Sequence, residues 1–407
     1  MLTRSLLLLM AVATGLTVGG NYVNQPLLDT IAADLAVRQG SAATLVTTAQ
    51  VSYGLGLLLV VPLGDLLERR RLLTALALLA AAGHAVCAVA TSFPVLLVGT
   101  AVAGLFSVAA QVLVPFAAEL AEPGRAGRAV GTVMSGLLVG ALLARSASGA
   151  LADVAGWHAP YAVVAAGLVL LALVLRRRLP VSVPRRVGGY RATLASTAAL
   201  VRAEPRLRTR ALLGAAGFAG VSVLFSTMTF LLAGERFGLS DGAIGLIALV
   251  GAGAALAASL AGRMADAGRT QLATGAGALL LVASWAALGL SASDALTSLV
   301  LFVAGFAVAD LGLQMVHVSN QNVIYPLRPD ARARLNSAYM TTYFTGGALG
   351  SAAGSAAWIA GGWGAVTVVG AAFALLTTAL WLVDVRAGRR ARTAAGEVSP
   401  AGAAAPR

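Results

Sequence analysis

The sequence predicts an all-α integral membrane protein whose 12 transmembrane helices form two pseudo-symmetric six-helix bundles around a central cavity. Three observations support this prediction. Hydrophobic residues make up 58% and charged residues 11% of the 407 residues, which lies outside the composition of soluble globular proteins. The chain contains many apolar runs of roughly 20 residues, the length that crosses a bilayer. A charged loop motif also occurs twice, about half a chain apart.

The apolar runs define the predicted spans, numbered one to twelve. Spans one to six lie at 5–24, 43–63, 72–91, 94–119, 129–151 and 160–175. Spans seven to twelve lie at 210–233, 242–262, 271–290, 295–322, 333–357 and 364–383. The predicted organisation is an N-terminal half at 1–175, a basic linker at 176–209, a C-terminal half at 210–385 and a disordered tail at 386–407. The first run imitates a signal peptide, but we expect it to be retained because its removal would break the two-half symmetry.

Basic residues indicate the direction of each span, because positive charge stays on the cytoplasmic side of short loops. The formal charge is +13, and the basic residues are all arginine. With the N-terminus inside, every arginine lies in a cytoplasmic segment except Arg38 and Arg236 in external loops and Arg145 within span five. We therefore expect a multi-pass protein of the bacterial plasma (inner) membrane with both termini in the cytoplasm.

The linker carries the densest positive charge of the chain. Its apolar positions Leu194, Ala198 and Val201 favour one short helix lying on the anionic inner leaflet. Nucleic acid is the alternative partner of such a segment. We expect no nucleic acid, because no aromatic stacking platform accompanies the charge.

The repeated motif is a charged turn between two spans. Its first copy follows span two and its second follows span eight. The residues that define the two copies are Gly64, Asp65, Glu68, Arg69, Arg70 and Arg71, and then Gly262, Asp266, Gly268 and Arg269. We expect both loops to act in gating, with the Glu68 carboxylate facing the N-terminus of span eleven, where the helix dipole favours negative charge.

This motif resembles G-x-L-x-D-R-x-G-R, the loop between helices two and three of major facilitator superfamily transporters, which has a weaker echo between helices eight and nine. The similarity covers about residues 1–385. The first copy departs from the family pattern with Glu68 in place of Asp and Arg71 in place of Gly. The second copy has Ala267 where Arg is usual. The resemblance implies two six-helix halves that alternate around a central substrate site.

Polar side chains recur on one face of several spans, and such residues line a water-filled cavity or a partner helix because they are costly in hydrocarbon. The resemblance implies that helices one, four, seven and ten surround the cavity. The predicted cavity residues are Asn21, Asn24, Gln25, Gln111, Arg145, Ser226, Gln314, Gln321, Asn336 and Tyr343. The alternative for the hydroxyl residues is that they only bond back to their own helix.

Three residues are candidates for proton coupling: Asp310 and His317 in span ten, and Glu119 at the end of span four. A charged side chain at the centre of a membrane costs roughly 2.5–3.5 kcal/mol, so Asp310 needs either a partner or a use. The alternative is that Asp310 simply pairs with Arg145. Histidine exchanges protons near physiological pH, so His317 can share the proton.

The resemblance implies a secondary active transporter of a small molecule, and we expect a proton-coupled exporter that works by alternating access. Drug antiporters of the family usually have a Gly-Pro pair in span five and an arginine in span four, and this sequence has neither. The alternatives are a proton-coupled importer of a small polar solute and a membrane sensor without flux. An enzyme is disfavoured, because the three histidines are dispersed and no H-E-x-x-H motif occurs. We expect a monomer in the lipid bilayer that uses the proton gradient, with no cofactor and no metal.

Overall fold

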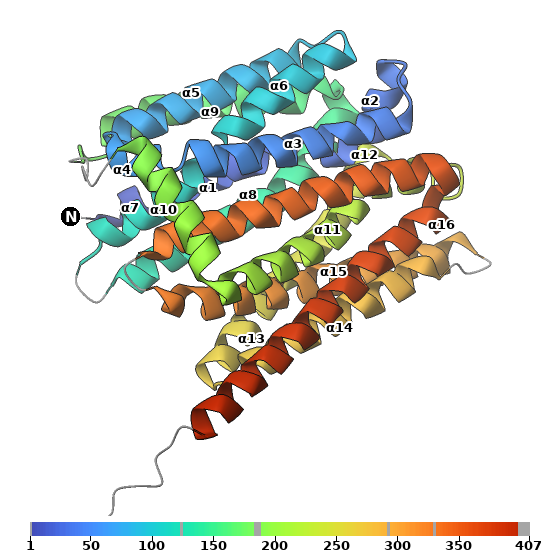
Figure 1. Cartoon of the computed structure of the whole chain (residues 1–407). Helices are drawn as coiled ribbons and strands as arrows, with labels where there is room; N and C mark the ends of the chain where they lie inside the picture. The colour runs from blue at the N-terminus through green and yellow to red at the C-terminus, as the bar shows by residue number, and fades with distance from the viewer. Residues whose placement is uncertain (1, 123–124, 183–188, 291–293, 329–330, 398–407) are drawn as a thin grey trace, which may run out of the picture.

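The computed structural model describes residues 2–122, 125–182, 189–290, 294–328 and 331–397, and this part of the chain contains helices and no strand (Figure 1). The first group of helices is α1 (Arg4–Gly20), η1 (Gln25–Leu27), α2 (Leu28–Asp34), α3 (Gln39–Leu59), α4 (Leu63–Leu66), α5 (Arg69–Ala88), α6 (Phe93–Phe106), α7 (Ala109–Leu120), α8 (Ala126–Ala155) and α9 (His158–Arg178). The second group follows α10 (Tyr190–Ala203) and is α11 (Pro205–Ala233), α12 (Asp241–Ile247), η2 (Ala248–Gly253), α13 (Ala254–Asp266), α14 (Thr270–Gly289), α15 (Ala295–Ile324), η3 (Tyr325–Leu327) and α16 (Arg332–Glu397).

Ten segments of the described chain are long and apolar enough to cross a membrane. One of them, Arg332–Gly388, has 57 residues. It bends at Gly361 and Gly362, whose backbone is not helical, so two helices meet there. Gly362 has a φ of +59°, a conformation that glycine adopts without steric cost. The structure is therefore an all-helical protein with about ten long apolar helices.

The predicted span at 242–262 is the least regular of the set. In the structure α12 ends at Ile247, the 3-10 helix η2 follows, and α13 begins at Ala254. Gly251 in η2 leaves a space that the Asp310 carboxylate fills, because a side chain at this position would meet that carboxylate. The break in the helix therefore places backbone of this segment beside a charged residue of α15.

Small residues let several helices pack backbone to backbone, as in membrane helix pairs. A side chain at Gly136 or Gly140 of α8 would collide with the backbone of α1 at Ala11 or Gly15. In the same way, α16 approaches α11 through Gly346 and Gly350, which lie against Ala215 and Ala219. The glycines of span eleven therefore serve helix packing.

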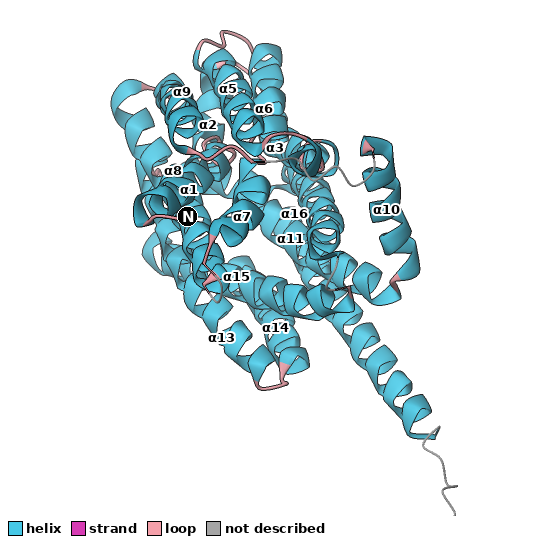
Figure 2. Ribbon diagram, turned by 90° about the vertical axis from the view of Figure 1, so that its left-hand side faces the viewer, coloured by secondary structure: helices cyan, strands magenta, loops and turns pink. Residues whose placement is uncertain are grey.

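The first and second groups of helices each pack mainly on themselves, and the most extensive contacts between them are α3 with α16 and α8 with α12 (Figures 1 and 2). Helix α3 lies along α16, with the Tyr53 and Phe344 rings 4.4 Å apart between their centroids. Helix α8 packs against α12 and η2. We call the end of the structure where α1 begins and α9 ends the terminal face, and the other end the opposite face.

The linker contains a helix where one was expected, whereas the tail differs from its prediction. The predicted linker helix is α10, and Tyr190 at its start donates a hydrogen bond to the Leu59 carbonyl at the end of α3 over 2.8 Å. The prediction of a disordered tail is wrong for residues 386–397, because α16 continues to Glu397. The arginine-rich composition of this stretch hid a helix that simply extends the last span. Residues 398–407 lie outside the described part.

Candidate functional site

Arg145 lies at the centre of the structure, between the two groups of helices. Its side chain on α8 is buried, and its Nε donates a 2.6 Å hydrogen bond to Gln25 Oε1. The guanidinium carbon lies 4.4 Å from the ring centroids of both Tyr22 and Phe225. Contacts with two aromatic faces stabilise a desolvated cation. Arg145 is therefore held by η1, by the residues just after α1 and by α11.

Gln25 was predicted as a cavity residue, and the structure shows how it is held. The Thr229 hydroxyl of α11 donates a 2.7 Å hydrogen bond to its backbone carbonyl. This bond positions the Gln25 amide against Arg145. Tyr22 and Phe225 were missed by the sequence analysis. The polar stripe of span one could have pointed to Tyr22, whereas nothing in span seven singles out Phe225 from other apolar residues.

Asp310 faces the same centre from α15, where Gln314, His317 and Gln321 continue its stripe. All four side chains are half-buried. Asp310 and Arg145 lie close enough to interact electrostatically, yet the described residues contain no ion pair between them. The alternative in which they simply pair is therefore not the arrangement in this structure. An acid and a base that share a polar centre without neutralising each other are able to bind separate partners.

Other predicted cavity residues cluster nearer the terminal face. Asn336 of α16 donates a 3.0 Å hydrogen bond to Gln111 of α7, and Tyr325 donates one of 3.0 Å to Asn336. Tyr343 is buried, and its ring stacks on Phe218 with centroids 4.2 Å apart. These residues form a polar and aromatic bridge between helices of the two groups.

Three predicted cavity residues point elsewhere. Asn21 and Asn24 line a small cavity inside the first group, together with His84 and Tyr161. Ser226 is buried, and its hydroxyl bonds back to the Val223 carbonyl of its own helix over 3.0 Å. The same hydroxyl also lies 3.5 Å from the Ser351 carbonyl of α16, so Ser226 contacts its own helix and a neighbouring one. Periodicity placed these residues on polar faces but did not distinguish the central cavity from the interior of one helix group.

Hydrogen bonds close the opposite face between the two groups. Thr30 donates to the Asp241 carboxylate over 2.6 Å, and Ser240 donates to Asp153 over 2.7 Å. Asp241 precedes the apolar part of its helix, and burial raises the pKa of its carboxyl to about 6, with a smaller contribution from Asp153. The Thr30 hydrogen bond acts in the opposite sense and lowers this pKa, so the contact is strongest when the Asp241 carboxylate is ionised.

The first copy of the loop motif forms an ion-pair cluster at the terminal face. Arg69 is buried and binds the Glu119 carboxylate through two nitrogens, at 2.6 and 3.1 Å. Its Nε also donates to the Gly64 carbonyl, and Asp65 lies 3.8 Å from the guanidinium. Glu119 was predicted to couple protons, and in this structure it is the partner of the motif arginine.

Glu68 does not face span eleven in this structure. Its carboxylate caps the N-terminus of α5 by accepting hydrogen bonds from the backbone N–H groups of Arg70 and Arg71, at 2.9 and 3.1 Å. The predicted contact is therefore wrong, although the reason given for it was physically sound. A carboxylate does lie at a helix N-terminus, but the helix is the one that Glu68 itself begins.

The second copy of the motif has a different role. Gly262 is half-buried, whereas Asp266, Gly268 and Arg269 are exposed. Gly268 has a φ of +72° and ends the turn after α13, and Arg269 precedes the first residue of α14. Neither Asp266 nor Arg269 takes part in an ion pair within the described chain.

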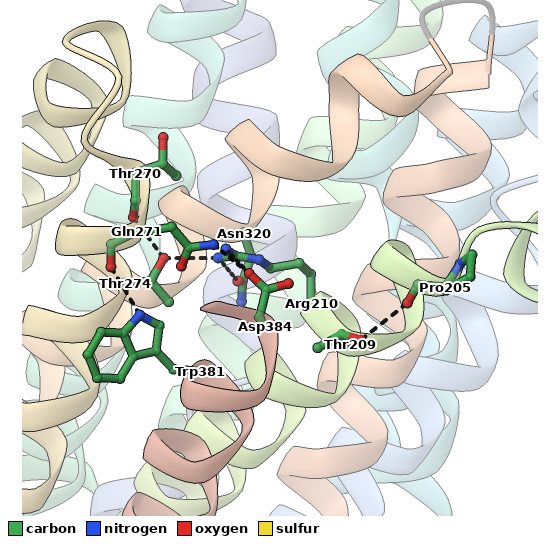
Figure 3. A network of polar contacts seen from close by, with 9 residues as sticks. All are labelled: Pro205, Thr209, Arg210, Thr270, Gln271, Thr274, Asn320, Trp381 and Asp384. Carbon is green, nitrogen blue, oxygen red and sulfur yellow. Dashed lines mark hydrogen bonds and ion pairs between the residues drawn. The ribbon is translucent and has the colours of Figure 1, made fainter. Parts of the chain in front are cut away.

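A buried ion pair that the sequence analysis missed lies in the second group (Figure 3). Arg210 of α11 is 0% exposed and binds Asp384 of α16 over 2.6 Å. Its other terminal nitrogen donates to Thr274 and Asn320, and Gln271 donates to the same Asp384 oxygen (Figure 3). Arg210 is the first residue of the predicted span seven, directly after the linker, and Asp384 directly follows the predicted span twelve. The acid and the base at the ends of two spans were the sequence signal that could have indicated this ion pair.

This network reaches the polar stripe of α15. Asn320 donates to the Tyr339 hydroxyl over 3.4 Å, and His317 Nδ1 lies 3.1 Å from the same hydroxyl. His317, predicted to exchange protons, is thus linked through Tyr339 and Asn320 to the Arg210–Asp384 pair. Among the described residues there is no group of three or more His, Cys, Asp or Glu side chains that could hold a metal ion.

Comparisons with known proteins agree with this geometry. The family model described as Major Facilitator Superfamily matches residues 10–309 and 234–405. The chain belongs to the major facilitator superfamily. It is 47% identical to the uncharacterized transporter YgaY of Escherichia coli O157:H7, over 93% of this chain and 95% of the relative. The resemblance seen in the loop motif is thereby confirmed, and the protein is a transporter of unspecified substrate in a family whose members are not enzymes.

Two further comparisons concern a named activity and the fold. The chain is 33% identical to the chloramphenicol resistance protein of Streptomyces lividans, over 76% of this chain and 79% of the relative. A solved bacterial homolog of the human lysosomal transporter Spinster, in an inward-facing and occupied conformation, superposes with a TM-score of 0.74 at 16% identity. That comparison covers 94% of this chain and 96% of the other, and it shows that the two share a fold.

Proposed function

We propose that the protein is a proton-coupled exporter of a small molecule that works by alternating access between two six-helix halves. The observation that carries the proposal is the centre of the structure, where Arg145 on α8 and Asp310 on α15 interact without forming an ion pair. Asp310 is proposed to take up the proton, and Arg145 to bind the substrate or to modulate Asp310. Gln25, Gln314 and His317 complete the proposed polar surface.

The ten long apolar segments support the 12 spans of the proposal. The 57-residue segment contains two helices across its kink, and the broken helix from α12 to α13 supplies the remaining span. The proposal places a monomer in the inner membrane of a bacterium, with the terminal face in the cytoplasm and the proton gradient as the energy source. Arginines concentrate at that face, as the positive-inside rule predicts.

Export is favoured by the relative named as a chloramphenicol resistance protein. In the proposed cycle, the hydrogen bonds from Thr30 and Ser240 at the opposite face break while contacts at the terminal face form. The seam between α3 and α16 changes least, because these helices contact each other from Gly40 and Ser355 at one end to Leu57 and Ser337 at the other. A rocking motion about such a seam exposes the centre to each side in turn.

The experiment is a transport assay in sealed vesicles with an imposed pH gradient, using chloramphenicol as the first probe. Asp310→Asn is expected to abolish gradient-driven movement while chloramphenicol binding survives, and Arg145→Gln is expected to weaken binding. Asp294→Asn serves as the matched control, because it removes one carboxylate at the start of α15 and retains an oxygen that caps the helix. An Asp310→Asn protein that still moved the probe against its gradient when a pH difference was imposed would refute the assignment of Asp310.

The second candidate is a proton-coupled importer. The departures from the drug-antiporter pattern in spans four and five favour it. The same vesicles separate the two: export predicts that substrate and protons move in opposite directions, and import predicts movement in the same direction. A probe that accumulates on the side that protons enter supports import.

A further inference from the structure

A second cavity, of about 380 Å³, opens at the terminal face away from the proposed transport centre. It lies between the start of α1, the end of α7 and the start of α8. Three arginines line it, Arg4, Arg125 and Arg128, together with Glu122 and the leucines Leu7 and Leu8. We call it the arginine pocket. None of these residues belongs to the site described above.

The charge of the arginine pocket is strongly positive. Glu122 is its one acid, and it forms a 2.8 Å ion pair with Arg125, in which both side chains are more than half exposed. Arg4 and Arg128 form no ion pair within the described chain, and both are exposed. Two unneutralised guanidinium groups therefore face one cavity. Guanidinium groups bind phosphate oxygens through paired hydrogen bonds.

Two helices also begin at this pocket. Helix α1 starts at Arg4 and α8 starts at Ala126, and residues of the first turn of each line the cavity. Helix N-termini carry unpaired backbone N–H groups and a partial positive charge, which favour anions. The helix ends and the arginines thus act in the same sense, and together they select a phosphate or another compact anion.

The remaining wall is apolar and continues onto the outer surface of α1. Leu7 is half-buried, while Leu8 is 61% exposed and Val12, one turn further along, is 62% exposed. In a membrane protein such a surface faces acyl chains. The pocket therefore joins an anion-binding floor to a lipid-facing wall, an arrangement that fits a phospholipid better than a soluble anion.

We propose that the arginine pocket binds the headgroup phosphate of an anionic phospholipid in the leaflet at the terminal face. Arg4 and Arg128 hold the phosphate from α1 and α8, and an acyl chain lies along Leu8 and Val12. The bound lipid joins α1 to α8 beyond the glycine contacts at Gly15 and Gly140. Because α8 also carries Arg145, lipid composition is able to influence the helix that holds the central charge.

The test is native mass spectrometry of the full-length protein with phosphatidylglycerol and with phosphatidylcholine of the same acyl chains. Wild type is expected to retain one phosphatidylglycerol with about tenfold preference over phosphatidylcholine. The double variant Arg4→Gln, Arg128→Gln is expected to lose that preference. The matched control Arg177→Gln, Arg191→Gln removes two exposed arginines elsewhere and is expected to keep it. Unfolding temperatures in lipid-free detergent check that all three proteins are folded.

Two further arms decide the source of the phosphate. Inorganic phosphate and glycerol phosphate at millimolar concentration are expected to leave the bound phosphatidylglycerol in place, and Leu8→Ser is expected to weaken it several-fold. Displacement of the lipid by inorganic phosphate, with no effect of Leu8→Ser, would make this a soluble-anion site and overturn the proposal. If the pocket variant and the control lost the preference for phosphatidylglycerol equally, the preference would depend only on the net charge of the protein. That result would also overturn the proposal.

Discussion

The ion pairs Arg69–Glu119 and Arg210–Asp384 hold the terminal ends of the two helix groups in different ways. Arg69 is bound through two nitrogens, but the Glu119 side chain keeps 34% of its surface exposed. In Arg210–Asp384 the side chains are 0% and 4% exposed. The first pair links the charged loop motif to the end of α7. The second joins four helices through Thr274, Asn320 and Gln271. The first is therefore suited to a contact that changes during transport, and the second to one that stays intact.

The comparison also shows that a sequence repeat does not guarantee a repeated structure. The motif occurs at the same position of each half, yet only its first copy is built into a buried ion pair. In the second half the buried arginine comes from the first turns of α11 and its acid from α16, both outside the motif. The loop of the second copy is left exposed. The predictions below test this difference, from the largest expected effect to the smallest.

Asp384→Leu should cause the largest loss, because it leaves the Arg210 guanidinium buried and without its carboxylate. Removing one partner of a buried pair lowers the free energy of unfolding by about 3–5 kcal/mol. The double variant Arg210→Met, Asp384→Leu should recover most of it. Unfolding in a chemical denaturant measures both. A single variant as stable as wild type would contradict the role assigned to this pair.

Glu119→Gln should lower the free energy of unfolding by less than Asp384→Leu does, because the Glu119 carboxylate is partly solvated. Loss of a charge-assisted hydrogen bond at a site that water reaches lowers stability by about 1.5 kcal/mol. Because we infer that this contact changes during transport, spin-label distances across the terminal face should also shift. Asp384→Leu combined with Arg210→Met is the control, and its distances should match those of wild type. Unchanged distances in Glu119→Gln would remove the distinction between a changing and a fixed pair.

Glu68→Ala should lower the stability of the protein by about 1 kcal/mol, the usual cost of losing a helix cap. Glu68→Asn retains a capping oxygen and should stay close to wild type. Thermal unfolding of the two variants in parallel measures the difference. If both lost stability equally, the carboxylate would have a role other than capping α5.

Asp266→Asn should have the smallest effect, within about 0.5 kcal/mol, as for surface substitutions away from any network. It is the motif counterpart of Glu68, so the pair of variants compares the two copies directly. The same unfolding measurement applies. A loss as large as that of Glu68→Ala would show that the second loop has a structural role that its exposure conceals.

Sequence reasoning predicted the elements that hydropathy controls and missed those set by packing at span ends. Apolar runs and the charged motif were sufficient for the family and for most helices. Gln25, Arg145 and the Asp310 stripe were found because polar groups in hydrocarbon carry a high free-energy cost, which singles them out in an apolar span. Arg210 was missed because a solvated arginine and a buried arginine at the start of a span look alike in the sequence until the end of α16 is placed beside α11. The bend at Gly361 and Gly362 lies between the predicted spans at 333–357 and 364–383, so hydropathy also located this boundary.

That bend determines where the chain accepts an added peptide. The two helices of α16 meet at Gly361 and Gly362 without a loop, and Trp358 and Trp363 on either side donate hydrogen bonds to Gln39 and to the Leu288 carbonyl. An epitope inserted there would pull both indoles away from their acceptors. Gly238 lies on the same face in an open turn, where an added side chain would meet no atom within 4 Å. A short epitope inserted after Gly238 would leave the helices in place, and antibody access to it in intact cells would reveal which side of the membrane this face occupies.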